Sequence, residues 1–449
     1  MIPGDTTPTT RRRTLATFCA LALGAGALSI PTPASASPSA GAPTGVLRAA
    51  SAKAEVPCPK PDVKPPAGRP ARPVPPADDP VLRAVGGDDL ATDGLIVPQG
   101  AKQPPALTAT SWLVADLDTG EVLGGCGPHV YGTPASVQKL LLAATVMDKL
   151  DPKKTITVTQ EDLNIEPGSS AVGLLKGGKY TIATLWLGLL LNSGNEAANT
   201  LARLGGGADG VQGTVTAMNA EAKRLGAYQT HAVTPSGLDG PGQFTSAYDL
   251  ALIARDCFAT ADFGRYALTK NTQIPAQKQL KKGGFQIQNE NRLIFDYKGA
   301  LGGKTGFTKL ARHSYVGAAQ RGGRRLVATL LGAENNPLRG YEQGEALLDW
   351  GFSLPKDASV GKLVTPDDTG TATGTATGES GAPASPDATR PAPAAARPAD
   401  DNGFPLLAAA GVAIVLAATP LLLLLTQRRR RVRRRRSRTS GTSDPQAFY

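Results

Sequence analysis

Ser136 and Lys139 are a pair of residues whose types and spacing suit nucleophilic chemistry. Pro134 precedes the serine by two positions, and a proline suits the first turn of a helix because the N–H that it lacks would have no partner there. A helix from residue 134 to about residue 150 would place the lysine amine one turn after the hydroxyl, on the same face. The free N–H groups at its start would favour developing negative charge. The alternative is an ordinary helix start with a solvated lysine. A serine and a lysine three residues apart often occur by chance, so this pair alone does not exclude it.

A nucleophilic serine needs a base, which is usually a histidine. The chain has three histidines, His129, His231 and His313, and no serine lies in a Gly-x-Ser-x-Gly turn, so a Ser-His-Asp hydrolase is disfavoured. We expect His231 and His313 to be structural. Lys139 can act as the base only if its amine is neutral, which requires burial or a neighbouring cation. We therefore predict that the pKa of Lys139 is lowered.

Two later segments supply partners for this pair. Ser193-Gly194-Asn195 lies between two predicted helices, and Lys304-Thr305-Gly306 lies at the start of a predicted strand. Lys304 would be the neighbouring cation. Ser193 and Asn195 alone are also consistent with a helix cap. The ordered set Ser-x-x-Lys, Ser-x-Asn, Lys-Thr-Gly is much more specific than any one of its members.

The elements around these motifs predict one α+β domain over residues 106–356. A hairpin of residues 112–116 and 121–123 leads into the Ser136 helix, and strands return after residue 273. The predicted helices are 181–191, 196–205, 211–225, 246–258 and 340–350, and the later strands are 286–288, 292–295, 314–320 and 324–332. Strands at both ends with helices between them indicate a single sheet with an inserted helical block.

The segments outside this domain do not have the composition of a folded core: they are apolar, Pro/Ala-rich or Arg-rich. Residues 1–36 read as a signal peptide, 37–105 as a Pro/Ala-rich disordered arm, 357–403 as a disordered spacer, 404–426 as a single transmembrane helix, and 427–449 as an Arg-rich cytoplasmic tail. This predicts a single-pass cell-membrane protein whose catalytic domain is extracellular. The formal charge is +11, but residues 37–403 carry only +1, so no nucleic-acid partner is expected.

The cysteines are compatible with an exported protein. Cys19 would leave with the signal peptide, and Cys58, Cys126 and Cys257 would remain. Because Cys257 lies in an apolar helical pattern, we expect it to be a buried thiol and Cys58–Cys126 to be a disulfide that ties the arm to the domain. No cysteine nucleophile, metal or cofactor is expected.

The domain resembles the D-alanyl-D-alanine carboxypeptidases, the low-molecular-mass penicillin-binding proteins. The resemblance covers most of residues 111–352 and is carried by the three motifs and by Asp118-Thr119-Gly120-Glu121-Val122-Leu123, Pro235-Ser236-Gly237-Leu238-Asp239 and Asn291-Arg292-Leu293. It implies a β-lactamase/transpeptidase-like fold with an antiparallel sheet. It also implies a peptidoglycan stem peptide ending in D-Ala-D-Ala as substrate and β-lactams as covalent inhibitors.

The resemblance further implies a role for each site residue. Ser136 would be the nucleophile, Lys139 its base, Ser193 a proton relay and Asn195 a positioning group. The substrate carboxylate would be held by Lys304, Thr305 and Arg339, and the oxyanion by the N–H groups of Ser136 and Phe307, while Gly306 leaves room for the substrate backbone. Arg339 is equally compatible with a solvated turn.

Two other functions remain open at this point. A serine β-lactamase or DD-endopeptidase would use the same fold and motifs. A catalytically inactive cell-surface binding protein is disfavoured by the intact motif residues. Glu161-Asp162-Leu163-Asn164 superficially resembles the deacylating glutamate loop of β-lactamases, but it precedes Ser193, so we assign it no role.

Overall fold

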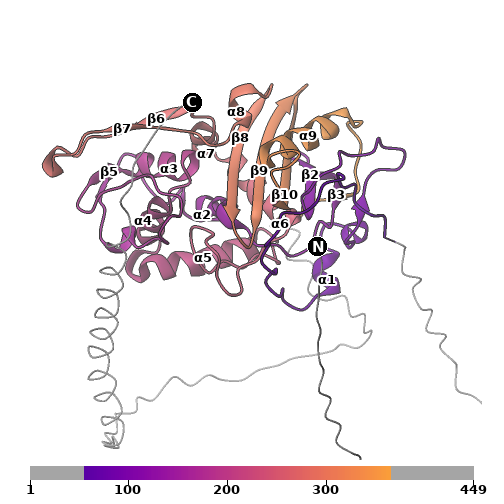
Figure 1. The fold of residues 1–449 in the computed structure, drawn as a ribbon, viewed down its shortest axis with the longest axis horizontal. Coiled ribbons are helices and arrows are strands. Elements are labelled where there is room, and N and C mark those ends of the chain that lie inside the picture. The colour runs from indigo at the N-terminus through magenta and orange to yellow at the C-terminus, as the bar shows by residue number, and fades with distance from the viewer. Residues whose placement is uncertain (1–54, 366–449) are drawn as a thin grey trace, which may run out of the picture. The chain divides into compact units, whose positions relative to one another are not determined.

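A computed structural model describes residues 55–365 of the chain (Figure 1). The predicted signal peptide, transmembrane helix and Arg-rich tail lie outside the described residues, as does the spacer beyond residue 365. Within residues 55–365, none of the helices combines the length and apolar character that crossing a bilayer requires.

A seven-stranded antiparallel sheet forms the centre of the domain (Figure 1). Its neighbouring strands follow the order β1-β3-β2-β10-β9-β8, and β11 also pairs with β3. The strands are β1 (Leu95–Ile96), β2 (Ser111–Asp116), β3 (Glu121–Cys126), β8 (Ala300–Thr308), β9 (Arg312–Arg321), β10 (Arg324–Ala333) and β11 (Gly361–Lys362). Leu331 pairs with Ser111 and Leu326 with Asp116, so the first and last parts of the domain meet in one sheet, as predicted.

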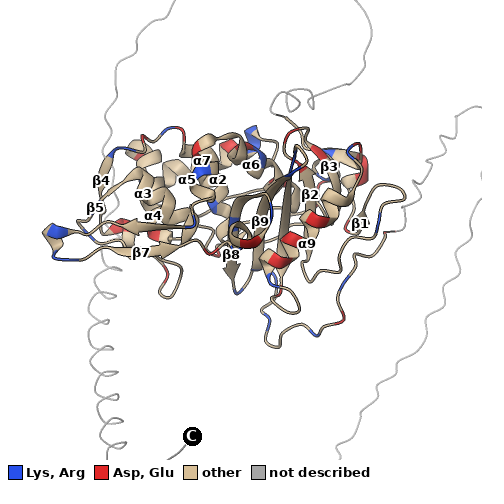
Figure 2. Cartoon of the chain, turned by 90° about the horizontal axis from the view of Figure 1, so that it is seen from above, with Lys and Arg blue, Asp and Glu red and all other residues tan. Residues whose placement is uncertain are grey.

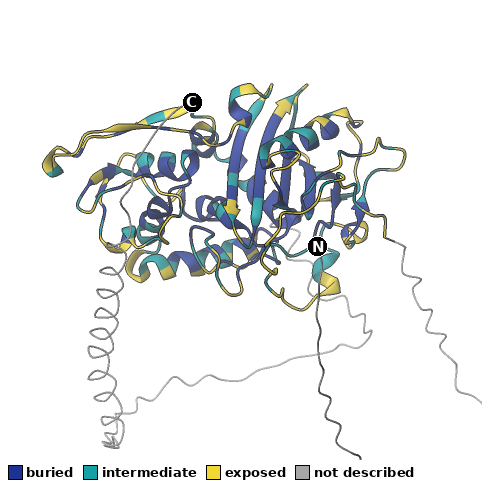
Figure 3. Cartoon of the chain, viewed as in Figure 1, coloured by how far each residue is buried: buried dark blue, intermediate teal, exposed yellow. Residues whose placement is uncertain are grey.

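Successive side chains along a central strand point to opposite faces of the sheet, so each strand contributes apolar side chains to the core on both faces. In β2, Trp112 and Val114 face the helix α9 (Gly340–Ser353), whereas Leu113 and Ala115 belong to the core shared with the helical block. Both faces are covered, and the central strands are buried along most of their length (Figure 3). The sheet is therefore a rigid support for residues at its strand ends.

The helical block lies between β3 and β8 in the chain. It contains α2 (Lys139–Val146), α3 (Ile182–Leu191), α4 (Asn195–Gly205), α5 (Gly210–Arg224), α6 (Ala247–Ala259) and α7 (Ala261–Ala267), with the small pairs β4 (Thr155–Thr157)–β5 (Lys179–Thr181) and β6 (Asn271–Ile274)–β7 (Phe285–Gln288). The bounds of α3, α4, α5 and α6 agree closely with the predicted helices, whereas α2 is shorter than expected and α7 was not predicted. Acidic and basic residues are interspersed along the described domain (Figure 2), in keeping with its small predicted net charge.

Two local predictions were wrong. Residues 292–295 were expected to be a strand, but Leu293–Asp296 form the short helix α8, and Asn291 Oδ1 accepts the N–H of Leu293 at 3.3 Å. A short apolar run does not distinguish a strand from a buried helical turn. Lys304-Thr305-Gly306 lies in the second half of β8 rather than at its start.

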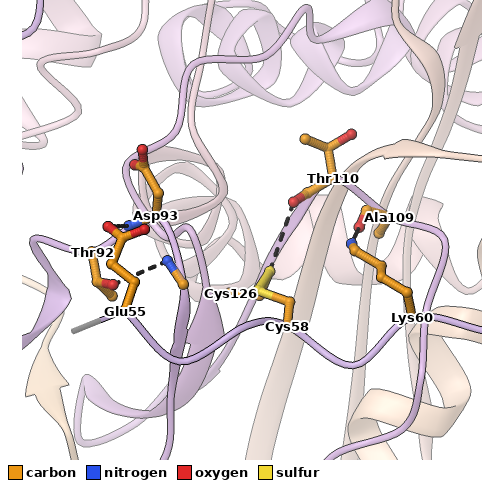
Figure 4. Close-up of a disulfide and its surroundings, with 9 residues drawn as sticks. Glu55, Cys58, Lys60, Thr92, Asp93, Ala109, Thr110 and Cys126 are labelled. Atoms are coloured by element: carbon orange, nitrogen blue, oxygen red, sulfur yellow. Dashed lines mark hydrogen bonds between the residues drawn. A yellow bond between two sulfur atoms is a disulfide. The ribbon is translucent and has the colours of Figure 1, made fainter.

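The arm is ordered from residue 55, which corrects the predicted disorder of residues 37–105 in the part that the structure describes. It contains α1 (Pro80–Arg83) and β1, and β1 pairs with β3. The predicted Cys58–Cys126 disulfide is present, and Lys60 donates a hydrogen bond to the carbonyl of Ala109 nearby (Figure 4). Backbone pairing and one disulfide hold this Pro-rich segment, rather than the burial of an apolar face of its own. Its sequence therefore shows no apolar periodicity.

The domain also ends later than the predicted residue 356. Gly361 and Lys362 of β11 pair with Val122 and Glu121, and Leu363 is fully buried. The first residues of the predicted spacer therefore belong to the fold. Cys257 is a buried free thiol, as expected.

Candidate active site

Ser136 lies in a 3-10 helix, Ala135–Gln138, that leads directly into α2. Ala135 is fully buried and has a φ of 50°, a left-handed conformation that costs energy for a residue with a side chain. The carbonyl of the preceding Pro134 accepts a hydrogen bond from Ser314 Oγ on β9 at 2.6 Å. This hydrogen bond ties the turn that carries Ser136 to strand β9 of the sheet.

Two glycines allow the surrounding backbone to close around this turn. A Cβ on Gly306 would lie 2.8 Å from the Ser136 nitrogen and 2.4 Å from Ser314 Oγ. A Cβ on Gly237 would lie 1.9 Å from the Ala135 carbonyl oxygen. Gly306 was expected to leave room for a substrate backbone, but here its missing side chain is already required for the approach of Ser136 to β8.

Lys139 is fully buried, and its amine contacts three oxygen atoms. Its Nζ lies 2.9 Å from Ser136 Oγ, 2.7 Å from Asn195 Oδ1 and 2.8 Å from the Ser236 carbonyl oxygen. The structure therefore joins the first two motifs through one buried lysine. The solvated lysine considered as an alternative is excluded.

The chemistry of these three oxygens decides where a neutral amine directs its lone pair. Asn195 Oδ1 and the Ser236 carbonyl can only accept hydrogen bonds, whereas the Ser136 hydroxyl can also donate one. The two N–H groups of neutral Lys139 satisfy the two obligate acceptors, and the lone pair then faces the hydroxyl of Ser136. Lys139 is placed to accept the proton of Ser136.

The electrostatic surroundings favour this neutral state. Burial lowers the pKa of Lys139 well below its usual range, and the charge of Lys304 lowers this pKa further, against the opposing effects of Glu196 and Glu290. The predicted direction is confirmed. Burial also lowers the pKa of Lys304 to about 8, so Lys304 remains mostly charged at neutral pH.

Ser193 and Asn195 connect α3 to α4. Ser193 has a φ of 56°, and its buried Oγ has no hydrogen-bond partner among residues 55–365. No side chain caps the start of α4, where Gly194 is the capping residue. The helix-cap alternative is therefore wrong, and the hydroxyl of Ser193 is free to bond a bound molecule.

A cleft of about 390 Å³ brings the predicted site residues together. Its walls include Ser136, Ser193, Asn195, Thr305, Gly306, Phe307 and Arg339. Thr305 to Phe307 come from β8, at the edge of the sheet, and Phe307 is 49% exposed. Lys304 is buried behind this wall and donates a hydrogen bond to the Thr305 carbonyl at 2.7 Å.

Arg339 is exposed on the cleft wall and precedes the first residue of α9. Its backbone N–H donates to Glu342 at 2.7 Å, which fixes the start of the helix. Arg339 thus lies where a ligand in the cleft could reach it, and its exposure is equally compatible with the alternative of a solvated turn residue. Its contact with a carboxylate stays a prediction.

Several residues of the site were given no role by sequence reasoning. Ser236 supplies a backbone carbonyl, Ser314 holds the nucleophile turn, and Glu290 faces the cleft and influences both lysines. The segment around Ser236 was recognised only as part of the resemblance. His313, expected to be purely structural, lines the cleft, with its ring 4.5 Å from that of Phe307.

Comparisons with known proteins agree with this geometry. A family model described as D-alanyl-D-alanine carboxypeptidase matches residues 98–335. The D-alanyl-D-alanine carboxypeptidase DacB2 of Mycobacterium tuberculosis is 44% identical over 276 residues, which cover 60% of this chain and 91% of that protein. The D-alanyl-D-alanine carboxypeptidase DacD of Salmonella typhimurium is 34% identical, and the match covers 56% of this chain and 64% of that protein.

Solved structures of D-alanyl-D-alanine peptidases are also similar to this chain. A crystal structure of a D-alanyl-D-alanine carboxypeptidase from Mycobacterium tuberculosis is similar, with a TM-score of 0.56 and 42% identity, covering 60% of this chain and 100% of that chain. The Streptomyces K15 DD-transpeptidase is similar with a TM-score of 0.54 and 25% identity, covering 56% of this chain and 100% of that chain.

Proposed function

The chain belongs to the D-alanyl-D-alanine carboxypeptidase family, and on this premise we propose that Ser136 cleaves the terminal D-alanine from peptidoglycan stem peptides through an acyl-enzyme. The protein is a serine peptidase, a hydrolase of the cell wall. β-Lactams would acylate the same serine.

The observation that carries this proposal is the set of three contacts around the buried Lys139. As the Oγ of Ser136 attacks the carbonyl carbon between the two D-alanines, its proton passes to Lys139 Nζ. The resulting oxyanion lies between the N–H groups of Ser136 and Phe307, each worth about 2.7–4 kcal/mol in comparable sites. The turn at Ala135 holds the N–H group of Ser136, and strand β8 holds that of Phe307, before substrate arrives.

Collapse of the intermediate breaks the C–N bond of the substrate. The departing amine takes, through Ser193, the proton that Lys139 received from Ser136, so Lys139 is neutral again; the hydroxyl of Ser193 has no other partner in the described domain. Water then attacks the acyl-enzyme, Lys139 accepts a proton from it, and Ser136 recovers its hydroxyl hydrogen. The products are D-alanine and the shortened stem peptide.

Cationic groups on one side of the cleft suit the substrate's terminal carboxylate. The hydroxyl of Thr305 and the guanidinium of Arg339 would bind it directly, the latter in the bidentate manner that arginine allows. Lys304, charged but buried behind the strand, would stabilise it electrostatically. This arrangement selects peptides with a free C-terminus.

The test is D-alanine release from diacetyl-Lys-D-Ala-D-Ala, together with labelling by fluorescent penicillin. The parent protein should release D-alanine and be labelled, whereas Ser136→Ala should do neither. Ser169→Ala, on the rim of the same cleft, is the matched control and should retain both. Release of D-alanine by Ser136→Ala, or neither activity in the parent, would contradict the proposal.

We further propose that the enzyme is exported by its signal peptide, residues 1–36, and anchored by residues 404–426. The support is the amino-acid sequence: 23 consecutive uncharged, predominantly apolar residues are followed by nine arginines. The catalytic domain would then act on the wall beside the membrane, with the C-terminus in the cytoplasm.

A further inference from the structure

The hairpin formed by β6 and β7 projects from the helical block, and the chain around it carries charge of one sign (Figure 1). Residues 263–289 contain no Asp or Glu and five basic residues, namely Arg265, Lys270, Lys278, Lys281 and Lys282. Residues 167–195 contain two lysines and again no Asp or Glu. Because residues 37–403 as a whole carry only +1, these two segments differ from an otherwise balanced domain.

The two segments lie side by side in the fold. The buried side chain of Gln277 joins them: its Oε1 accepts the N–H of Lys179 at 2.7 Å, and its Nε2 donates to the Lys179 carbonyl at 3.0 Å. A Cβ on Gly173 would lie 3.6 Å from the ring of Phe285. We call residues 271–288 together with Lys179 the basic hairpin.

One face of the basic hairpin fixes it to the domain. Asn271 pairs with Gln288 and Ile274 with Phe285 in its ladder, and the side chains of Ile274 and Ile287 are buried in the core of the helical block. The opposite face and the connecting turn are largely exposed (Figure 3). The hairpin therefore presents its exposed side chains from a supported backbone.

The positive charge of this surface is not neutralised within residues 55–365. Lys179, Lys278, Lys281 and Lys282 are exposed, and none of them forms an ion pair with a carboxylate of the described domain. The turn of the hairpin is blue in Figure 2. Lys281 also has a φ of 54°, a conformation that costs energy for a residue with a side chain. Such a surface attracts an anionic partner.

The residue types on the hairpin favour an anionic bilayer as that partner. Lysine is a hydrated point charge on a flexible stem, which suits an array of phosphates, whereas arginine suits bidentate binding of one phosphate. Phe285 is 40% exposed on the same hairpin, and aromatic rings beside basic residues are typical of surfaces that bind at a bilayer interface. A soluble polyanion offers no apolar region for this ring.

We propose that the basic hairpin is a docking surface for an anionic lipid bilayer. Its lysines would contact the lipid phosphates, and Phe285 would enter the boundary between headgroups and acyl chains. The proposed anchor, which begins at residue 404, would supply a bilayer close to the domain. Because contacts of a few exposed lysines are weakened by salt, the hairpin orients a domain that the anchor retains.

Docking would also set the position of the catalytic cleft. Residues 168–170 line the cleft and continue along the chain to Gly173, which lies beside Phe285. A hairpin held on the bilayer would therefore fix the distance of the cleft from the membrane surface.

The mature protein without its anchor, residues 37–403, tests this surface because every element of the fold lies within residues 55–365. Its sedimentation with vesicles of phosphatidylcholine, alone or mixed with phosphatidylglycerol, measures binding at low ionic strength. We expect binding to the mixed vesicles only, and release as salt rises, because the contacts are screened. The assay uses no substrate, so its outcome is independent of the proposed catalytic activity.

Lys278→Gln/Lys281→Gln/Lys282→Gln should weaken binding to the mixed vesicles roughly 10- to 100-fold, since each lysine near an anionic surface contributes up to about fivefold. The matched control removes the same charge from three exposed lysines elsewhere on the domain and should bind like the parent: Lys223→Gln/Lys298→Gln/Lys356→Gln. Both variants should keep the parental midpoint of guanidinium denaturation, because the replaced side chains are exposed.

Phe285→Ala separates a bilayer from a soluble polyanion as the partner. It should weaken binding to the mixed vesicles at least about threefold, because an apolar ring no longer leaves water. Its binding to polyglycerol phosphate, a soluble phosphodiester polymer, should equal that of the parent. Equal binding of the parent and the triple hairpin variant to the mixed vesicles, or binding of the parent to the polymer and not to the vesicles, would overturn the docking surface.

Discussion

Lys139 is the residue on which the proposed reaction depends. It can accept a proton only when neutral, and it directs its lone pair at Ser136 only because two obligate acceptors occupy its N–H groups. A charged lysine would instead donate three hydrogen bonds to the same oxygens. The activity should therefore follow the titration of Lys139 on the acid side and that of Lys304 on the alkaline side.

The first prediction concerns pH. The kcat/KM for diacetyl-Lys-D-Ala-D-Ala should rise as Lys139 loses its proton and fall above about pH 8, because Lys304 loses its charge as pH rises through its lowered pKa. A stopped assay of D-alanine release across the pH range measures both limbs. A profile that keeps rising above pH 9 would contradict the role of Lys304.

The second prediction separates the two lysines. Lys304→Gln removes the charge that lowers the pKa of Lys139, so the acid limb should move to higher pH. The maximal kcat/KM should fall roughly 10- to 150-fold, the range expected when a hydrogen bond or ion contact to a charged group is lost. An acid limb at the same pH as in the parent would show that Lys304 does not act on Lys139.

The third prediction concerns the fit of β8 against the nucleophile. Gly306→Ala places a methyl group 2.8 Å from the Ser136 nitrogen, so the turn must shift, and kcat should fall at least about 100-fold, as when an oxyanion donor is displaced. Gly264→Ala, with open space around its Cβ position, is the control. Circular dichroism should be unchanged in both, and a Gly306→Ala variant with parental kcat would refute the close fit.

At the scale of the elements, the sheet and the arm differ in how they are held. β2, β9 and β10 have apolar side chains on both faces, and the pairing of β2 with β10 brings together residues more than 200 positions apart in the chain. The arm pairs through the short β1 and depends on the Cys58–Cys126 bond for its attachment. Breaking that bond should therefore affect stability more than catalysis.

The fourth prediction is for the variant Cys58→Ser/Cys126→Ser. Opening a loop with a sequence separation of 68 residues should lower the free energy of unfolding by about 4 kcal/mol, an upper value from the chain-entropy argument. Guanidinium denaturation of the variant and of Val74→Ala, a control at an exposed arm position, measures it. Release of D-alanine from the short substrate should change less than about twofold, because the arm contributes no residue to the catalytic cleft.

At the scale of the whole molecule, catalysis and attachment are carried by separate parts of the chain. The site residues lie within residues 136–339, and the apolar run begins only at residue 404. The proposed anchor is therefore removable without touching the site. This separation gives the attachment proposal a test of its own.

The fifth prediction is that deleting residues 404–449 transfers the protein from the membrane fraction to the medium, with D-alanine release retained. Removing only residues 427–449 leaves the apolar run in place, so this protein should stay with the membrane. Fractionation followed by penicillin labelling measures both. Sedimentation of the longer deletion with the membranes would contradict the anchor.

The sequence by itself determined the chemistry and the class of fold. Ser136, Lys139, Ser193, Asn195 and Lys304 were found from motif order, because side-chain types and short spacings are local properties. Helix and strand bounds were predictable for the same reason: apolar periodicity follows from burial on one face. Residues 292–295 were assigned wrongly, because a short apolar run fits either state, and the short helix α7 was not predicted.

Only the tertiary structure decided how those residues act and where the domain ends. The Ser236 carbonyl that completes the surroundings of Lys139 is 97 positions away in the chain, and no local pattern marks a backbone acceptor. The order of the arm was missed because it comes from contacts with distant strands rather than from its own composition. For the same physical reason, only folding brings Lys60 and Arg69 of the arm to the hollow that Phe307 and Arg312 also line.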